Sequence, residues 1–410
     1  MGRRAKGCSM RLRSIKYQEW EQTPQEWRLE TVTFGPRMLV VGRNASGKSR
    51  TLAITAALAR NLVGIQPPAL SGNYVVTFDH DEREYIYELH YHELEVVHER
   101  IVIDGKEYLS REPGGAGKIL AEKIGTGTFM DFQVPTNILA AVARRDAIQH
   151  SFIEPLFNWA NSFRYYQFGQ IAQNSLAFFT PGGQKVDDRD QNAVVGIFRE
   201  GQKLFGDSFV ESIKADLHAI DYEIDDLLLT PPVSVRFNGN GPIPLTVSAR
   251  EHGLLGLTDQ IGMSTGMFRV IALLIHVNFA QFKGSASSVF VDDIGEGLDF
   301  DRSCRLIELL RSKAIAHKFQ LVMSTNDKFV MNHVPLEEWT VLHRKGHVVE
   351  VMNYANSKDH FDQFKFTGLS NFSFFEMNAN ELSAVELATQ QDEDVDDEGY
   401  DFPNRRKHDV

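Results

Sequence analysis

The stretch that most restricts the fold of this chain is residues 42–49, which read G-R-N-A-S-G-K-S and follow the apolar run 37–41. The spacing G-x-x-x-x-G-K-S, between a strand and a helix, is that of a phosphate-binding loop. In such a loop, backbone N–H groups surround phosphate oxygens, the lysine supplies positive charge and the serine binds Mg²⁺. The helix expected over 49–62 is apolar on most of its surface, which indicates burial against a parallel sheet.

Length and composition indicate a globular protein of two or three structural units. The 410 residues are 42% hydrophobic and 24% charged, and no apolar run approaches the length of a membrane span, roughly 18 to 20 residues. The start, M-G-R-R-A-K-G-C, has no signal-peptide segment, so we expect a cytoplasmic protein without a membrane partner. Only two cysteines are present, too few for a disulfide scaffold or a cysteine-based zinc site. The net charge of −12 argues against a chain-wide nucleic-acid surface.

Four segments are expected along the chain. Residues 10–140 hold the loop and three alternating runs typical of an antiparallel β meander, and 141–232 are expected to form a helical insert. The clearest helix of that insert has one apolar face from Phe209 to Leu227. Residues 233–376 return to alternating helix and strand, and the acidic tail 377–410 is expected to be disordered.

A second motif supplies the carboxylates that a phosphate-binding loop needs. The apolar strand expected over 287–291 ends in Asp292-Asp293-Ile294-Gly295-Glu296-Gly297-Leu298-Asp299. At that strand end, Asp292 is placed to hold Mg²⁺ and Asp293 to orient the attacking water. The next strand, 320–323, ends in Ser324-Thr325-Asn326-Asp327, so both strands present polar residues where a doubly wound sheet binds its ligand.

A third motif is the segment 263–269, M-S-T-G-M-F-R, which opens an apolar helix. Serine and then glycine at a helix start make a second anion-binding terminus. In this order, the motifs resemble those of an ABC-type ATPase of the SMC/RecF/OLD branch. The resemblance covers 10–60 and 250–350 well and implies an α/β P-loop NTPase core with the meander and the helical insert attached.

The resemblance also implies a role for each matching residue. ATP would lie on the loop, and Mg²⁺ would be held by Ser49, Asp292 and a glutamine, for which Gln133 is the first choice and Gln149 the second. Residues 297–299 match the loop that contacts a partner subunit. The implied nucleotide-binding set is Gly42, Arg43, Asn44, Ala45, Ser46, Gly47, Lys48, Ser49, Arg50, Ser264, Gly266 and Gln133, and the catalytic set is Lys48, Asp293 and Asn326.

Two departures from the family pattern predict slow hydrolysis. Asp293 stands where the family has glutamate, and its carboxylate is about 1.5 Å shorter in reach. A misplacement of this size costs on the order of a hundredfold in rate. Asn326 replaces the usual histidine and cannot carry charge. The alternative is that Glu296 compensates and turnover is ordinary.

The family resemblance also implies partners. In that family the S-x-G motif, here Ser264 and Gly266, is the signature sequence, which caps the γ-phosphate bound by the opposite subunit. One subunit offers its phosphate loop and its signature helix in different directions, so we expect ATP to promote a head-to-tail homodimer or a higher homo-oligomer. No fused nuclease motif is present, and chains of this layout resemble the AAA-family ATPase components of bacterial anti-phage defence systems, Septu-like, retron-associated or PARIS-like. We therefore expect a sensor or regulator of a separately encoded effector protein.

Two alternatives remain for the biological role. A RecF-like DNA repair or recombination ATPase would bind DNA and would be stimulated by duplex DNA. A transporter nucleotide-binding subunit would accompany a membrane permease, although the long region between loop and signature favours the soluble branch.

Overall fold

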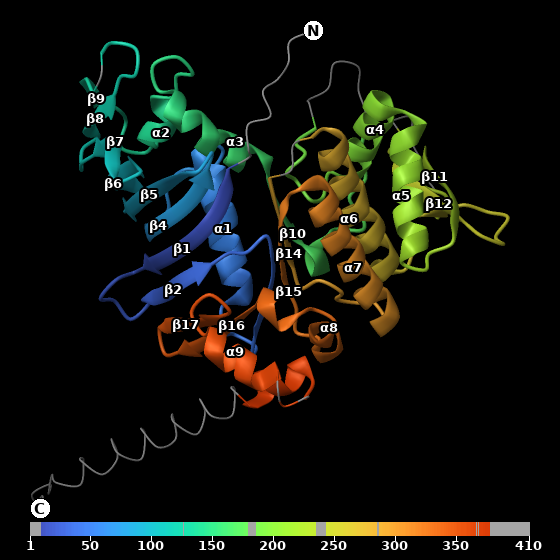
Figure 1. Cartoon of the computed structure of the whole chain (residues 1–410). Helices are drawn as coiled ribbons and strands as arrows, with labels where there is room; N and C mark the ends of the chain where they lie inside the picture. The colour runs from blue at the N-terminus through green and yellow to red at the C-terminus, as the bar shows by residue number, and fades with distance from the viewer. Residues whose placement is uncertain are drawn as a thin grey trace, which may run out of the picture.

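The computed structural model describes residues 10–125, 127–178, 186–234, 243–284, 287–365, 367 and 369–377, so the expected acidic tail lies outside the described residues except for its first residue. The fold is mixed α/β, as the sequence predicted. One sheet of 14 strands crosses the molecule, and a separate sheet of three strands lies beside the helices (Figure 1).

The middle of the large sheet is parallel. Its strands lie in the order β10-β14-β15-β3-β16, and each neighbouring pair runs in the same direction. The phosphate-loop strand therefore has four parallel companions, two of which are the strands expected to end in polar residues. The bounds are β3 (Arg37–Gly42), β10 (Phe163–Gln167), β14 (Ser288–Asp292), β15 (Gln320–Ser324) and β16 (Trp339–Lys345).

The rest of the large sheet continues from β16 in the order β17-β2-β1-β4-β5-β6-β7-β8-β9. From β4 to β9, consecutive strands are antiparallel neighbours, which confirms the expected meander. The bounds are β1 (Arg11–Glu19), β2 (Trp27–Thr33), β4 (Ser71–His80), β5 (Arg83–His92), β6 (Glu95–Ile103), β7 (Lys106–Arg111), β8 (Ala116–Leu120), β9 (Phe129–Gln133) and β17 (Val348–Asn353).

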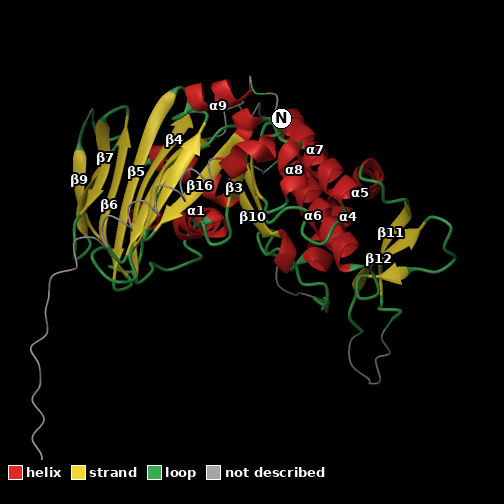
Figure 2. Ribbon diagram, turned by 90° about the horizontal axis from the view of Figure 1, so that it is seen from below, coloured by secondary structure: helices red, strands yellow, loops and turns green. Residues whose placement is uncertain are grey.

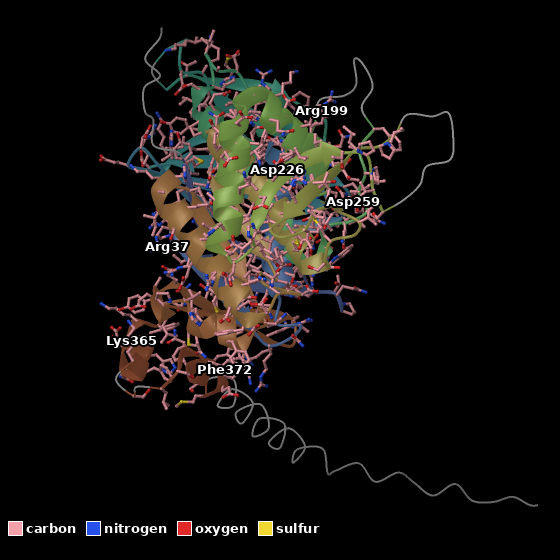
Figure 3. All side chains as sticks on the ribbon, turned by 90° about the vertical axis from the view of Figure 1, so that its right-hand side faces the viewer. Arg37, Arg199, Asp226, Asp259, Lys365 and Phe372 are labelled. Carbon is pink, nitrogen blue, oxygen red and sulfur yellow. The ribbon has the colours of Figure 1, made fainter. Side chains whose placement is uncertain are left out.

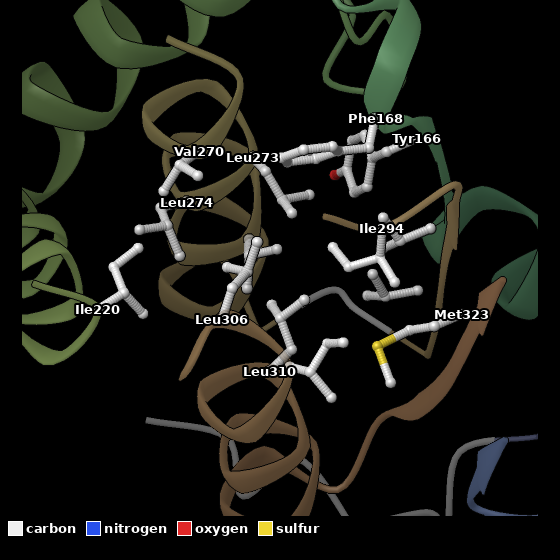
Figure 4. Close-up of a cluster of buried hydrophobic side chains, with 14 of the residues drawn as sticks. Tyr166, Phe168, Ile220, Val270, Leu273, Leu274, Ile294, Leu306, Leu310 and Met323 are labelled. Carbon is white, nitrogen blue, oxygen red and sulfur yellow. The ribbon is translucent and has the colours of Figure 1, made fainter. Parts of the chain in front are cut away.

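The parallel strands divide the hydrophobic interior into two cores. Successive side chains of a strand point to opposite faces of a sheet. Leu39 and Val41 of β3 accordingly join one core, whereas Met38 and Val40 join the other. The first core holds the longer helices α6 and α7, and the second holds α1 and the inner face of the meander. A close-up of the first core is shown in Figure 4.

The helices lie on both faces of the parallel strands, and the meander extends away from them on one side (Figure 2). Helix α6 is long and apolar enough to cross a membrane, the one such helix in the described part of the chain, but most of it is buried inside the protein. The bounds are α1 (Lys48–Leu62), α2 (Ala140–Ala143), α3 (Glu154–Ser162), α4 (Val194–Phe205), α5 (Asp207–Ala219), α6 (Thr265–Phe282), α7 (Phe300–His317), α8 (Lys328–Asn332) and α9 (Lys358–Lys365), with 3₁₀ turns η1 (Ser151–Ile153), η2 (Phe168–Gln170) and η3 (Leu336–Glu338).

The expected helix over 209–227 is shorter in the structure. Helix α5 ends at Ala219, and Asp221 adopts a left-handed conformation with φ of 70°. Beyond this turn, β11 (Ile224–Thr230) pairs with β12 (Thr246–Glu251), which also pairs with β13 (Thr258–Asp259). Ile224 and Leu227 continue the apolar spacing of α5, but they lie in β11, where pairing with β12 replaces the helix.

A buried ion pair ties the meander to the turn before α2. Glu99 and Arg111 are both fully buried, with their charged atoms 3.7 Å apart. The Glu99 carboxylate accepts hydrogen bonds from the backbone N–H groups of Ala140 and Ala141 at 2.5 and 2.9 Å, and from the Tyr87 hydroxyl at 3.0 Å. Arg111 donates to two backbone oxygens of the same turn, those of Ile138 and Pro135, at 2.6 and 3.0 Å.

Candidate nucleotide site

The turn between β3 and α1 depends on glycine at two positions. Gly47 has φ of 104°, a conformation that disfavours any side chain, and a Cβ there would lie 3.2 Å from the Trp27 ring and 3.3 Å from Val349. A Cβ on Gly42 would lie 2.7 Å from the backbone oxygen of Leu342. The glycines thus allow the backbone to fold tightly over neighbouring strands, which leaves the start of α1 open toward the pocket described below.

Lys48, the first residue of α1, folds back over the turn. Its ammonium group donates to the backbone oxygens of Gly42 at 2.8 Å and Arg43 at 3.2 Å. Burial lowers the pKa of Lys48, whereas the charges of Asp293 and Asp292 act in the opposite direction. The lysine therefore lies within the electrostatic reach of both carboxylates.

The end of β14 presents the two carboxylates. Asp292 is buried, and it accepts hydrogen bonds from the Ser324 hydroxyl at 2.5 Å and the Tyr165 hydroxyl at 3.4 Å. At Asp293 the chain turns with φ of 53°, and its N–H donates to the same Ser324 hydroxyl at 2.9 Å. Ser324 at the end of β15 thereby fixes both residues.

Asp293 lies in the pocket itself. The amide of Asn326 donates to the Asp293 carboxylate at 3.3 Å. Burial raises the pKa of Asp293 above its ordinary value, the charge of Asp292 adds to the rise, Lys48 opposes it, and Glu296 adds a further rise. A raised pKa makes a carboxylate a stronger base, so Asp293 is better suited than an ordinary aspartate to accept a proton from water.

The pocket has a volume of about 300 Å³ and is open to solvent. It brings together residues 44–50 of the phosphate loop, Asp293 and Asn326, all of which the sequence had selected, whereas the selected Gly42 and Arg43 do not line it. It also includes two residues that sequence reasoning missed, Trp27 from β2 and Arg344 from β16. The lining residues are Trp27, Asn44, Ala45, Ser46, Gly47, Lys48, Ser49, Arg50, Asp293, Asn326 and Arg344.

This arrangement decides the fold. A phosphate-loop strand and an acid-ended strand are separated by one parallel strand, and their carboxyl ends meet at one pocket. The core is a P-loop NTPase-like fold.

Arg50 occupies the side of the pocket next to Trp27. Its guanidinium lies 4.3 Å from the centre of the Trp27 ring and forms an ion pair with Glu19. The indole is 1% exposed, so Arg50, and not the ring, forms the accessible surface at this point. A base or ribose entering there would meet a guanidinium held flat by an aromatic ring.

The oxygen donors of the pocket fit Mg²⁺ bound together with a nucleotide. The part of the chain that the structure describes has no cluster of three or more His, Cys, Asp or Glu side chains able to hold a metal alone. Magnesium in nucleotide sites is held by one or two carboxylates or hydroxyls together with phosphate oxygens and water. Ser49 and Asp293 line the pocket, and Asp292 lies directly behind them.

The helix start with Ser264 and Gly266 lies outside this pocket. The Ser264 side chain is exposed and accepts from the N–H of Met267 at 3.3 Å, as an N-cap does. Gly266 packs closely on the loop after β14, because a Cβ there would lie 2.5 Å from the Gly297 oxygen. Arg269, one turn on, donates to the backbone oxygens of Glu296, at 3.0 Å, and Gly169.

The glutamine prediction is corrected by the structure. Gln133 lies on β9, at the far edge of the large sheet, and its amide donates to the Gly114 oxygen at 2.7 Å. Gln149, the second choice, lies in the turn before η1, where its N–H donates to Asp146 and its backbone oxygen accepts from Glu122. Both residues belong to the meander side of the molecule, and neither lines the pocket.

The glutamine at the expected place is Gln167. It ends β10, which runs parallel to β14, and its register partner is Asp292. The signal was present as the aromatic run F-R-Y-Y followed by glutamine, but that run was assigned to the helical insert. Gln167 is therefore the glutamine that the strand order brings level with the buried carboxylate.

Comparison with known proteins gives no family. No protein-family model matches the chain, and no curated protein matches it. Solved structures with a similar arrangement include an SMC head bound to the C-winged helix domain of ScpA, with 13% identity and a TM-score of 0.49 over 83% of this chain and 96% of that one. Similarity at this level does not identify what the present chain does.

Two further structures are similar to the same degree. The SMC head domain from Thermotoga maritima has 14% identity and a TM-score of 0.41 over 84% of this chain and 98% of that one. An Smc head domain with an extended coiled coil, bound to the C-terminal domain of ScpA and derived from Pyrococcus furiosus, has 12% identity and a TM-score of 0.46 over 87% of this chain and 100% of that one.

Proposed function

We propose that this chain is an ABC-type ATPase that binds ATP with Mg²⁺, hydrolyses it slowly and dimerises head to tail on ATP. The observation that carries the proposal is the position of two anion-binding features. Lys48 and Asp293 share one pocket, whereas the signature serine, Ser264, is exposed outside it. A second copy of the chain would place its own Ser264 over the pocket and close it.

In this proposal, the loop amides and Lys48 bind the phosphates of ATP, with Ser49 and Asp292 as the residues that hold Mg²⁺. A bound magnesium ion would supply positive charge to the phosphate oxygens. Asp293 accepts the proton of the attacking water, and Asn326 orients the Asp293 carboxylate through the hydrogen bond between them. Gln167 takes the place of the glutamine proposed from sequence.

The proposal is tested with Asp293→Asn, which keeps the shape of the side chain and removes the base. With ATP and Mg²⁺, this variant is expected to accumulate as a dimer by size-exclusion chromatography with light scattering, because ATP binds and is not consumed. The matched control is Asp293→Asn combined with Lys48→Ala, which should stay monomeric. A monomer for Asp293→Asn at saturating ATP would contradict the proposal.

The pH dependence of hydrolysis tests the role of Asp293 separately. A base must be deprotonated, so the raised pKa of Asp293 moves the acidic limb of kcat/KM to higher pH than an ordinary aspartate would give. Glu296→Gln removes one of the charges that raise this pKa, so the limb is expected to shift to lower pH. Glu308→Gln, an exposed change on α7, is the control and should leave the limb in place. A shift in the other direction would contradict the assignment.

We further propose that this chain is cytoplasmic and controls a separately encoded effector protein in anti-phage defence. The described helices between α1 and α6 have at most 13 residues, which favours a compact regulatory ATPase over a long-armed SMC-like protein. Affinity purification from the native host, with and without ATP, should recover one stoichiometric partner. Hydrolysis stimulated by duplex DNA, with salt-sensitive DNA binding, would favour the RecF-like alternative instead.

A further inference from the structure

The segment that follows β10 connects the two halves of the proposed catalytic machinery. It begins at Gln167, level with Asp292 of β14, and passes through η2, where Phe168 is fully buried. It ends at Ala177, which forms an isolated bridge with Leu245 just before β12. The chain therefore runs from the Mg²⁺ side of the pocket to the sheet from which the signature loop departs.

Gln173, in the middle of this segment, holds the signature loop with every polar atom of its side chain. Its amide nitrogen donates to the backbone oxygens of Gln260 and Met263, both at 2.7 Å. Its amide oxygen accepts from the Thr265 hydroxyl at 3.2 Å. Met263 and Thr265 are the residues on either side of Ser264, so Gln173 forms hydrogen bonds with the chain immediately before and after the signature serine.

Gln260, in the signature loop, in turn bonds to the backbone of the segment that carries Gln173. This fully buried residue donates from its side chain to the backbone oxygens of Gln173 at 3.0 Å and Ser175 at 2.9 Å. Its amide oxygen accepts from the N–H of Val247 in β12 at 3.1 Å. The two glutamine side chains thus join the segment and the signature loop by five hydrogen bonds, three made by Gln173 and two by Gln260.

The signature loop, residues 260–264, is also held by backbone hydrogen bonds, from Gln260 to Val247 of β12 at 2.9 Å and from Met263 to Asp259 at 3.0 Å. Asp259, at the end of β13, accepts from the N–H groups of Ile261 and Gly262 at 3.1 and 3.0 Å, which shapes the turn itself. In Figure 3, Asp259 lies far from the C-terminal helix that carries Lys365. Ser264 is then fixed from both directions: it caps α6, where Phe268 N–H donates to its backbone oxygen at 3.0 Å, and the Gln173 side chain bonds to the residues before and after it.

We infer that Gln173 is a positioning residue that sets the signature serine from the strand end beside Asp292. The inference rests on the proposed head-to-tail dimer. Ser264 serves the ATP held by the partner, so a change at Gln173 acts on the partner's site and not on the pocket of its own subunit.

The test uses mixed dimers with one working site. One subunit carries Lys48→Ala and cannot hold ATP, so the single filled site consists of the intact subunit's phosphate loop and the Lys48→Ala subunit's signature. Gln173→Met, which keeps the length of the side chain and removes its hydrogen bonds, is placed in either subunit. The two subunits carry different tags, and the mixed dimer is purified on both.

In the Lys48→Ala subunit, Gln173→Met is expected to lower kcat about tenfold, the effect of losing about 1.4 kcal/mol of hydrogen bonding at the signature. In the intact subunit, the same change should alter kcat less than about twofold, because its own signature faces an empty loop. Monomeric ATP affinity should not change. The control is Asn174→Met, an exposed neighbour that should have no effect in either subunit.

Three outcomes would overturn the inference: an equal loss in both subunits, which indicates a folding role; a loss only in the intact subunit, which indicates a role in its own pocket; and no loss in either. If Gln173→Met does not fold, Thr265→Val replaces it. This variant removes the hydrogen bond from the Thr265 hydroxyl to Gln173, and its loss of kcat should likewise depend on which subunit carries it. A parent pair without Gln173→Met that fails to dimerise on ATP refutes the proposed function itself, which separates the two failures.

Discussion

Lys48→Ala is expected to weaken ATP binding by about a hundredfold or more, equivalent to about 3 kcal/mol. Lys48 is 6% exposed, and its ammonium group donates to the backbone oxygens of Gly42 and Arg43. Phosphate oxygens are stronger partners than these carbonyls, because both the donor and the acceptor are then charged. Alanine leaves the loop amides in place and removes the one lysine among the described residues that line the pocket.

Isothermal titration calorimetry with ATP and Mg²⁺ measures the change directly. Lys118→Ala is the control, since Lys118 is exposed on β8 at the far side of the meander. Equal affinity for the wild type and Lys48→Ala would mean that the loop does not bind the phosphates. The thermal unfolding of both variants in the absence of ATP checks that the fold is kept.

Glu99→Ala is expected to cost about 3–5 kcal/mol of the free energy of unfolding. The substitution leaves the Arg111 guanidinium at 0% exposure without its carboxylate, and it removes the acceptor for the N–H groups of Ala140 and Ala141. A charge left unpaired in the interior is far more costly than a lost surface contact. Urea unfolding followed by tryptophan fluorescence and circular dichroism measures the loss.

The control for Glu99→Ala lies on the next strand. Glu107 pairs with Arg100 at 2.8 Å, but both side chains are more than a third exposed, so Glu107→Ala should cost less than about 1 kcal/mol. Combining Glu99→Ala with Arg111→Ala should cost less than the sum of the two single changes, because neither charge is then stranded. Additive losses would mean that the two residues act independently.

Local patterns were sufficient to predict the parts of the candidate site that lie close in sequence. The loop from Gly42 to Ser49, the acidic pair Asp292 and Asp293 and the helix start at Ser264 each carry their own spacing, and each lies at a strand end or a helix start in the structure. The fold class followed from their order along the chain, because a parallel strand needs a crossover before the next one.

Residues that depend on distant pairing could not be predicted in this way. Trp27 and Arg344 enter the pocket because β16 lies beside β3 and β2 lies two strands further on, an order that no local run reveals. Gln167 was missed because a five-residue aromatic run reads equally well as part of a helix. Gln133 was chosen for its position before Val134 and Pro135, whereas strand pairing carries it to the far edge of the sheet.

The length and apolar composition of α6 have a consequence for the synthesis of the protein on the ribosome. This helix alone among those described passes the length and hydropathy test for a membrane span. It packs on α4, α5 and η2, which precede it, and shares its core with residues of β14, α7 and β15, which are synthesised afterwards. A ribosome-bound chain that has reached Phe282 therefore contains 18 mostly apolar residues before β14, α7 and β15 have been added to their core. Until β15 has been completed at Ser324, we expect the nascent chain to bind chaperones that recognise exposed apolar segments.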